Sequence, residues 1–252
     1  NCSKADLISG WNIIIKAIKH PQWLVGVVLR HTPIGHWISD NTFIRLEYFS
    51  GMKKFPNLKS PKSYNEKLQW LKLNDIHPEY KNIVDKAEAK RFVEERLGDD
   101  AKQYIIPTLG VWNTFDEIDF DKLPDQFVLK TTHDTGGVVV VKNKKSMDVQ
   151  VVQKKIERSL KHNYFYEHRE YPYKDIKPRI IAEKFLEDKP GEGLKDYKFF
   201  CFDGVPRMLF VATDRPFDTR FDFFDMEWNH LPFLQGHPWA KKKICKPIGF
   251  DR

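Results

Sequence analysis

Apolar residues along the chain follow two different spacings, which predict helices in some stretches and strands in others. Helical spacing dominates residues 1–55. It returns after Ser63, where Glu66 stands three residues later and completes a capping box. Another helix is predicted over 81–97, because its apolar positions repeat at helical spacing and Gly98 can end it. The first part of the chain is therefore expected to be mainly helical.

Strands are predicted where short apolar runs are bounded by turn residues. The predicted strands are 127–130, 138–141, 178–186, 196–202 and 206–212. A helix is predicted between the second and third of them, starting at Ser146, and the aromatic stretch 164–173 is expected to be a loop. Two strand–turn–strand units separated by a helix favour an α+β fold with two lobes.

The first predicted hairpin carries the strongest hint of chemistry. Lys130 ends its first strand, and Gly136-Gly137 precede its second. Glycines can take positive φ and leave backbone N–H groups exposed, which makes a concave site for an anion. The segment therefore predicts a phosphate clamp, although an ordinary hairpin turn explains the same residues. It is not a P-loop, because G-x-x-x-x-G-K-[ST] does not occur.

Composition narrows the class of ligand. The chain has 252 residues, 31% of them charged and 41% hydrophobic, and a formal net charge of +7. This balance predicts a globular protein that suits a phosphorylated or acidic ligand, an anionic membrane surface or nucleic acid. No aromatic–basic repeat supports nucleic acid, so nucleic-acid binding is not expected.

Cysteine and histidine patterns argue against a disulfide framework or a zinc site. The three cysteines are far apart, with no C-x-x-C, and the nine histidines form no ligand motif. Cys201, set among phenylalanines, is expected to be a buried thiol, and a reducing cytoplasmic setting is the default.

Trp11, Ile14 and Ile18 share a helical face beside lysines. That helix is expected to pack on the protein, while peripheral membrane contact stays open.

Several motifs in order resemble the TupA-like branch of the ATP-grasp proteins, which is associated with bacterial cell-surface polysaccharide and teichuronopeptide biosynthesis. The matching stretches are 63–73, 85–86, 123–130, 133–137, 181–186 and 196–202. The resemblance implies an ATP-grasp fold with two lobes and a nucleotide cleft between them. It implies a helical N-terminal region at 1–55, a pre-grasp region at 56–125, a first lobe at 126–186 and a second lobe at 187–252, incomplete at its C-terminus.

The resemblance also assigns ligand-binding roles. Lys130 matches the lysine that contacts the nucleotide phosphates, and Lys86 matches a second such lysine. The loop that folds over the β- and γ-phosphates matches His133, Asp134, Thr135, Gly136 and Gly137. The strand that holds adenine matches Glu183, Lys184, Phe185 and Leu186, with Glu187 or Asp188 near the ribose. Lys198 and Arg215 resemble the cations that face the γ-phosphate and the transferred group.

Those roles imply an ATP- and Mg²⁺-dependent ligase that joins a carboxylate to an amine through an acyl phosphate, with a cell-surface glycan or its precursor as partner. The metal ligands are unknown. ATP-grasp enzymes take Mg²⁺ from acidic residues on late strands, whereas Asp222, Asp225 and Glu227 stand in a setting that does not match. The expected acidic strands would follow the end of the chain. Two alternatives stay open, a catalytically silent ATP-binding scaffold and a glycosyltransferase.

Overall fold

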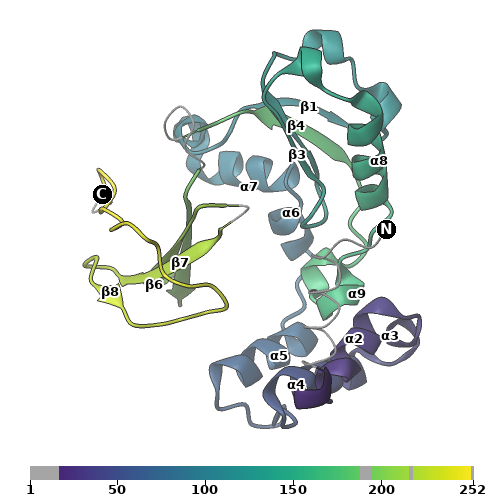
Figure 1. The fold of residues 1–252 in the computed structure, drawn as a ribbon, viewed down its shortest axis with the longest axis vertical. Coiled ribbons are helices and arrows are strands. Elements are labelled where there is room, and N and C mark those ends of the chain that lie inside the picture. The colour runs from purple at the N-terminus through teal and green to yellow at the C-terminus, as the bar shows by residue number, and fades with distance from the viewer. Residues whose placement is uncertain (1–16, 188–193, 216–217, 251–252) are drawn as a thin grey trace. The chain divides into compact units, whose positions relative to one another are not determined.

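The computed structural model describes residues 17–187, 194–215 and 218–250. The chain forms two compact units, one ending at Phe185 and one beginning at Leu186 (Figure 1). Each unit contains one four-stranded sheet. Helices together with two antiparallel sheets confirm the α+β class. The four-part division of the chain stays a prediction.

The first unit opens with helices, as the spacing of apolar residues predicts. These are α2 (Trp23–His31), α3 (Ile34–Trp37), α4 (Asp40–Met52) and α5 (Tyr64–Asn74). The predicted capping box is confirmed, since Ser63 accepts a hydrogen bond from the Glu66 amide and Glu66 accepts one from the Ser63 amide. Trp11 and Ile14 lie outside the described residues, whereas Ile18 is exposed.

The single helix predicted over 81–97 is wrong. Two helices, α6 (Tyr80–Val84) and α7 (Glu88–Leu97), are separated at Asp85, whose backbone is extended. The Asp85 carboxylate accepts hydrogen bonds from the amides of Ala87 and Glu88, which starts a new helix. Arg179 holds the same carboxylate at 3.0 Å from a distant part of the chain. The end of α7 at Gly98 is as predicted.

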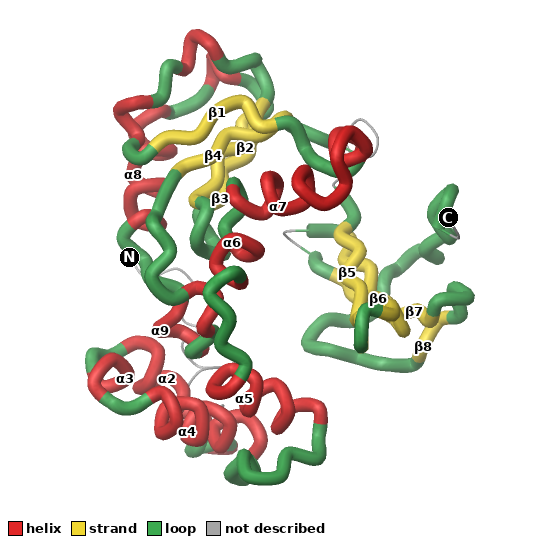
Figure 2. The backbone as a smooth tube through the Cα atoms, turned by 180° about the vertical axis from the view of Figure 1, so that it is seen from behind, coloured by secondary structure: helices red, strands yellow, loops and turns green. Residues whose placement is uncertain are grey.

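The first sheet has the order β1-β4-β2-β3, and all its pairs are antiparallel. Its strands are β1 (Thr108–Trp112), β2 (Phe127–Thr131), β3 (Val138–Val141) and β4 (Ile180–Lys184). The hairpin β2–β3 confirms the expected pairing around the polar turn. Helix α8 (Val149–Leu160) lies against one face of this sheet (Figure 2), where Val152 and Ile156 are buried.

Two local expectations in the first unit need correction. Helix α8 starts at Val149 rather than Ser146, because Asp148 accepts a hydrogen bond from the Val151 amide and caps it. The stretch 164–173 is not simply a loop, since it contains α9 (Phe165–His168). Short 3₁₀ helices complete the unit: η1 (Gly98–Gln103), η2 (Phe115–Glu117), η3 (Phe120–Lys122), η4 (Lys144–Ser146) and η5 (Tyr171–Tyr173).

The second unit is built on the antiparallel sheet β5-β6-β7-β8. Its strands are β5 (Asp196–Phe202), β6 (Val205–Thr213), β7 (Arg220–Asp225) and β8 (His230–Leu231). Asp203 and Gly204 both take positive φ, as an Asp-Gly hairpin turn requires. Both faces carry apolar clusters, one centred on Leu209 and one on Phe210. The prediction of a buried Cys201 is wrong, because its side chain is exposed on β5.

Among the described residues, no helix has the length and apolar character needed to cross a membrane.

Candidate functional site

The face of the first sheet opposite α8 carries the residue that the sequence singles out. Phe127 and Leu129 of β2 lie in the core under α8, so Val128 and Lys130 between them face the other way. In the register, Val128 lies opposite Glu183 and Lys130 lies opposite Ile181. This second face therefore combines apolar β-branched side chains with charged groups.

The charged groups on this face form a compact ion-pair cluster. Glu183 is buried, and its two carboxylate oxygens contact Lys130 Nζ and Lys90 Nζ separately. Burial alone would raise the pKa of Glu183, but hydrogen bonds from both lysines outweigh it and lower the pKa below its usual value. One carboxylate thus holds two ammonium groups in place beside an apolar surface.

Lys86 lies next to this cluster and is held by the backbone of the hairpin. Its Nζ donates to the carbonyl oxygens of Thr131 at 2.9 Å, Thr132 at 3.4 Å and Asp134. Burial lowers the pKa of the Lys86 ammonium, although the nearby Asp134 acts in the opposite direction. The break between α6 and α7 places Lys86 there, since the Lys86 amide also donates to Thr132 O at 3.0 Å.

The turn between β2 and β3 offers open backbone donors. Among the described residues, none accepts a hydrogen bond from the amides of Thr135, Gly136 or Gly137. Such consecutive free N–H groups form the kind of concavity that binds anions. Neither of the paired glycines takes the positive φ that is open to glycine.

The need for Gly137 is steric. A Cβ on Gly137 would lie 2.1 Å from Ser159 Oγ and 2.2 Å from Thr131 Oγ1, whereas a Cβ on Gly136 would meet nothing within 4 Å. The turn therefore lies directly on α8, and only residue 137 of the pair must lack a side chain.

His133 and Asp134 hold the start of the turn in place through buried hydrogen bonds. Both are buried; Asp134 accepts hydrogen bonds from Thr131 Oγ1 and Ser159 Oγ, and His133 Nε2 lies 2.9 Å from His162 O. Burial lowers the pKa of His133, which favours the neutral ring. His133 Nδ1 has no hydrogen-bond partner in the described part of the chain. In this geometry the two side chains position the turn, and their contact with a nucleotide stays a prediction.

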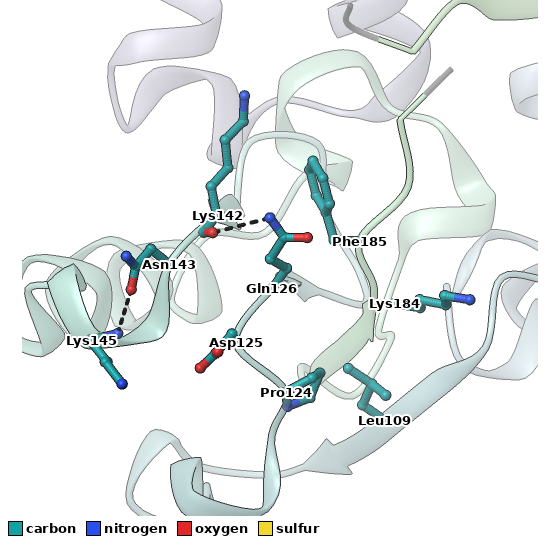
Figure 3. Close-up of a pocket in the computed structure, with 9 residues that line it drawn as sticks. All are labelled: Leu109, Pro124, Asp125, Gln126, Lys142, Asn143, Lys145, Lys184 and Phe185. Atoms are coloured by element: carbon teal, nitrogen blue, oxygen red, sulfur yellow. Dashed lines mark hydrogen bonds between the residues drawn. The ribbon is translucent and has the colours of Figure 1, made fainter. Parts of the chain in front are cut away.

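The residues predicted to hold adenine lie at the end of β4. Glu183 points into the lysine cluster, whereas Lys184 and Phe185 line a cavity of about 790 Å³ at the other end of β2 from Lys130 (Figure 3). The remaining lining residues are Leu109, Pro124, Asp125, Gln126, Lys142, Asn143 and Lys145. Leu186 begins the second unit and is exposed, and Asp188 lies outside the described residues.

In the second unit, the structure brings Lys198 and Arg215 together. Lys198 Nζ lies 3.5 Å from an Asp196 carboxylate oxygen that Arg215 also contacts. All three side chains are more than a third exposed. Two cations thus converge on one carboxylate at the edge strand β5, which leaves both accessible to a further anion.

The carboxylates weighed as metal ligands serve the fold instead. Asp222 accepts hydrogen bonds from His230 Nε2 and the Ala240 amide, and Asp225 accepts from the amides of Glu227 and Asn229. Within the described ranges, no group of three or more His, Cys, Asp or Glu side chains could hold a metal ion. Asp222 and Asp225 are therefore not assigned to Mg²⁺.

Sequence reasoning missed part of this site. No local pattern marks Lys90, because its contact with Glu183 depends on tertiary structure. The predicted strand 138–141 contains Val138 and Val140, and both are exposed on the Lys130 face. Their two-residue alternation with Val139, which packs toward the core, was the available signal.

Comparison with known proteins identifies the family of the chain. The family model described as TupA-like ATPgrasp matches residues 66–251. No curated protein and no solved structure matches the chain. The matched range contains both sheets, the lysine cluster and the open turn, and it spans well over half of the sequence. The chain therefore belongs to the TupA-like ATP-grasp family.

Proposed function

We propose that this protein is an ATP-dependent ligase that joins a carboxylate to an amine through an acyl phosphate. The observation that carries the proposal is the arrangement around Lys130. Lys90 and Lys130 share Glu183, Lys86 holds the carbonyl groups of the hairpin, and the turn that follows β2 has three backbone amides with no partner among the described residues. Such a collection of cations and oriented N–H groups suits a polyphosphate, and the fold generally binds ATP.

The apolar residues on the same face suit the base of a nucleotide. Val138 and Val140 are exposed, and Val128 of the neighbouring strand lies between them and β4. An apolar surface beside charged groups suits a flat heterocycle. When a phosphate enters, Glu183 can keep one lysine while the other turns to the ligand.

The proposed reaction has two steps. A carboxylate oxygen of the substrate attacks the γ-phosphorus of ATP, the bond to ADP breaks, and an acyl phosphate forms. An amine then attacks the acyl carbon, phosphate leaves with the C–O electron pair, and the amine nitrogen loses a proton to give an amide. Because two anions meet in the first step, cations must stabilise it, and Lys198 and Arg215 are the proposed residues.

Mg²⁺ has no assigned place in this scheme. ATP-grasp proteins generally bind ATP together with Mg²⁺, but the described residues offer no carboxylate cluster for it. For that reason the scheme gives the chain's own groups only the tasks of binding the phosphates and neutralising charge.

A glycan carboxylate on a cell-surface polysaccharide or its precursor is the proposed acceptor, and the cytoplasm, at the inner face of the membrane, is the proposed location. The formal charge of +7 supports an acidic partner. A small-molecule carboxylate would meet the same chemical requirement.

A catalytically silent ATP-binding scaffold is the second candidate, and it is favoured because the described ranges contain no group of three or more metal-ligating side chains. A glycosyltransferase has less support. The chain does contain one D-x-D sequence, Asp119-Phe120-Asp121. However, Asp119 accepts from the Asp121 amide at 3.1 Å and pairs with Lys122, so it caps a short helix.

Two measurements separate these candidates. Calorimetry with a non-hydrolysable ATP analogue tests nucleotide binding, and ADP release with pairs of uronic acids and amines tests turnover. Binding with amine-dependent ADP release supports the ligase. Binding without turnover under any pair supports the scaffold, and no binding removes both.

A further inference from the structure

The second unit contains a cavity that the proposed nucleotide site does not use. Its volume is about 500 Å³. Its lining includes Asp222, Trp228, His230, Trp239, Lys242 and Lys243. We propose that this cavity binds a sugar ring that carries an anionic group, which would make it the acceptor subsite. This inference rests on the proposed function for its role, but its evidence is independent of the ATP site.

A buried carboxylate fixes the polar side of the cavity. Asp222 is only 6% exposed, and it accepts hydrogen bonds from the Ala240 amide at 2.7 Å and from His230 Nε2 at 2.9 Å. An ionised carboxylate only accepts, so Nε2 carries the imidazole proton. Nδ1 has no partner among the described residues. His230 therefore offers a ring nitrogen, fixed in place by Asp222, to a hydroxyl group, which can either donate or accept.

Two tryptophans give the cavity a rigid aromatic wall. The Trp239 ring meets the His230 ring edge-on, with centroids 5.2 Å apart, and its Nε1 donates to Phe233 O at 2.8 Å. Trp228 stacks on Phe224 at 4.4 Å, and its Nε1 donates to Ile244 O. Both indole N–H groups are already satisfied, so Trp239, which is 41% exposed, presents only apolar ring surface. The C–H face of a pyranose fits such a surface.

Three consecutive lysines form the third wall. Lys241 pairs with Asp218 at 2.9 Å. Lys242 and Lys243 are exposed, and no described residue forms an ion pair with either. Asp222, which also lines the cavity, is buried and already bonded. Among the described residues, the positive charge of Lys242 and Lys243 is therefore not paired, which favours an anionic ligand.

The three walls together select the ligand class. A bare phosphate would use the lysines but not the tryptophan face, and a neutral sugar would use the tryptophan face but not the lysines. A sugar ring with a carboxylate or phosphate uses the aromatic wall, the free His230 ring nitrogen and the cations at once. The carboxylate form would also be the group that the proposed ligase activates.

The test is a binding titration of the full chain without ATP. The probes are a galacturonic acid tetrasaccharide, a neutral glucose tetrasaccharide, glucose 6-phosphate and inorganic phosphate. Tighter binding of the uronate or the sugar phosphate than of the neutral sugar and inorganic phosphate supports the proposal and identifies the anionic group. Equal binding of all four probes, or no binding, overturns it.

Variants locate the binding. Trp239→Ala and the double variant Lys242→Glu/Lys243→Glu should each weaken binding about tenfold or more, while Trp239→Phe should keep most of it. The double variant Lys53→Glu/Lys54→Glu makes the same charge change at exposed residues of the first unit and should bind normally. Equal loss in both double variants would mean non-specific attraction and overturn the proposal. Each variant is also titrated with an ATP analogue. If the sugar site is refuted but the analogue still binds normally, the proposed nucleotide site stands.

Discussion

Replacing Gly137 by alanine should destabilise the first unit, while the same change at Gly136 should not. The added methyl at 137 would lie 2.1 Å from Ser159 Oγ and 2.2 Å from Thr131 Oγ1. Neither hydroxyl can retreat easily, because both are buried and bonded to Asp134. Gly136 faces open space, so its alanine meets nothing.

The magnitude follows from two opposing effects. Overpacking a well-filled site costs about 1–3 kcal/mol. Replacing glycine stabilises by roughly 0.4–1 kcal/mol through the unfolded chain, provided that the backbone conformation suits alanine. Since neither glycine has positive φ, that gain applies to both. We expect Gly137→Ala to lose about 1–2 kcal/mol and Gly136→Ala to be neutral or slightly stabilised.

Urea denaturation of the two full-length variants measures this difference directly, and titration with an ATP analogue measures its effect on the loop. Gly137→Ala should also bind the analogue more weakly, because the turn must move away from α8 to make room. If Gly137→Ala were as stable as Gly136→Ala, the close contact between the turn and α8 would be refuted.

Three further predictions test other parts of the structure. Glu183→Ala leaves two ammonium groups without their buried partner and should cost about 3 kcal/mol or more in urea denaturation; an unchanged midpoint would contradict the ion-pair cluster. The pKa of Glu66 is lowered to about 2, chiefly by the hydrogen bond from the Ser63 amide. The contribution of Glu66 to stability is therefore present above pH 4.5 and is lost as the pH falls toward 2. Glu66→Gln should flatten this acid dependence of the unfolding free energy, and an unchanged dependence would argue against the capping box. Trp37 is 80% exposed beside Arg30, and no acidic residue occurs between 17 and 39. If Trp37 contacts the membrane surface, Trp37→Ser should reduce the fraction of protein that sediments with anionic vesicles about tenfold. Tyr104→Ser, at a residue that is 72% exposed, should not reduce it. Equal effects of the two variants would exclude a membrane contact of Trp37.

The sequence predicts the elements whose causes are local. The capping box at Ser63 and the β-branched run after Gly137 are each specified by neighbouring residues, and the structure has both. The break between α6 and α7 is different, because Arg179 holds Asp85 from 94 residues away. The steric need for Gly137 likewise depends on Ser159 of α8, which no local pattern encodes.

The candidate site divides in the same way. Lys130 could be singled out because it ends an apolar run before a glycine turn. The roles of Lys86 and Lys90 depend on how α7 packs near the sheet, so these lysines can be read from the chain but their contacts cannot. The carboxylates of strand β7 are visible in the sequence, whereas the buried pairing of Asp222 with His230 requires the neighbouring strand β8.

The central claim is that Lys130 binds the phosphates of ATP. Calorimetry of the full chain with a non-hydrolysable ATP analogue tests it, with Lys130→Met as the variant and the exposed Lys102→Met as the control. Lys90 still pairs with Glu183 in the variant, so the sheet should stay folded. We expect Lys130→Met to bind about tenfold more weakly or worse and Lys102→Met to bind normally. Equal affinity of the two variants, or no binding by the unmodified chain, would contradict the account.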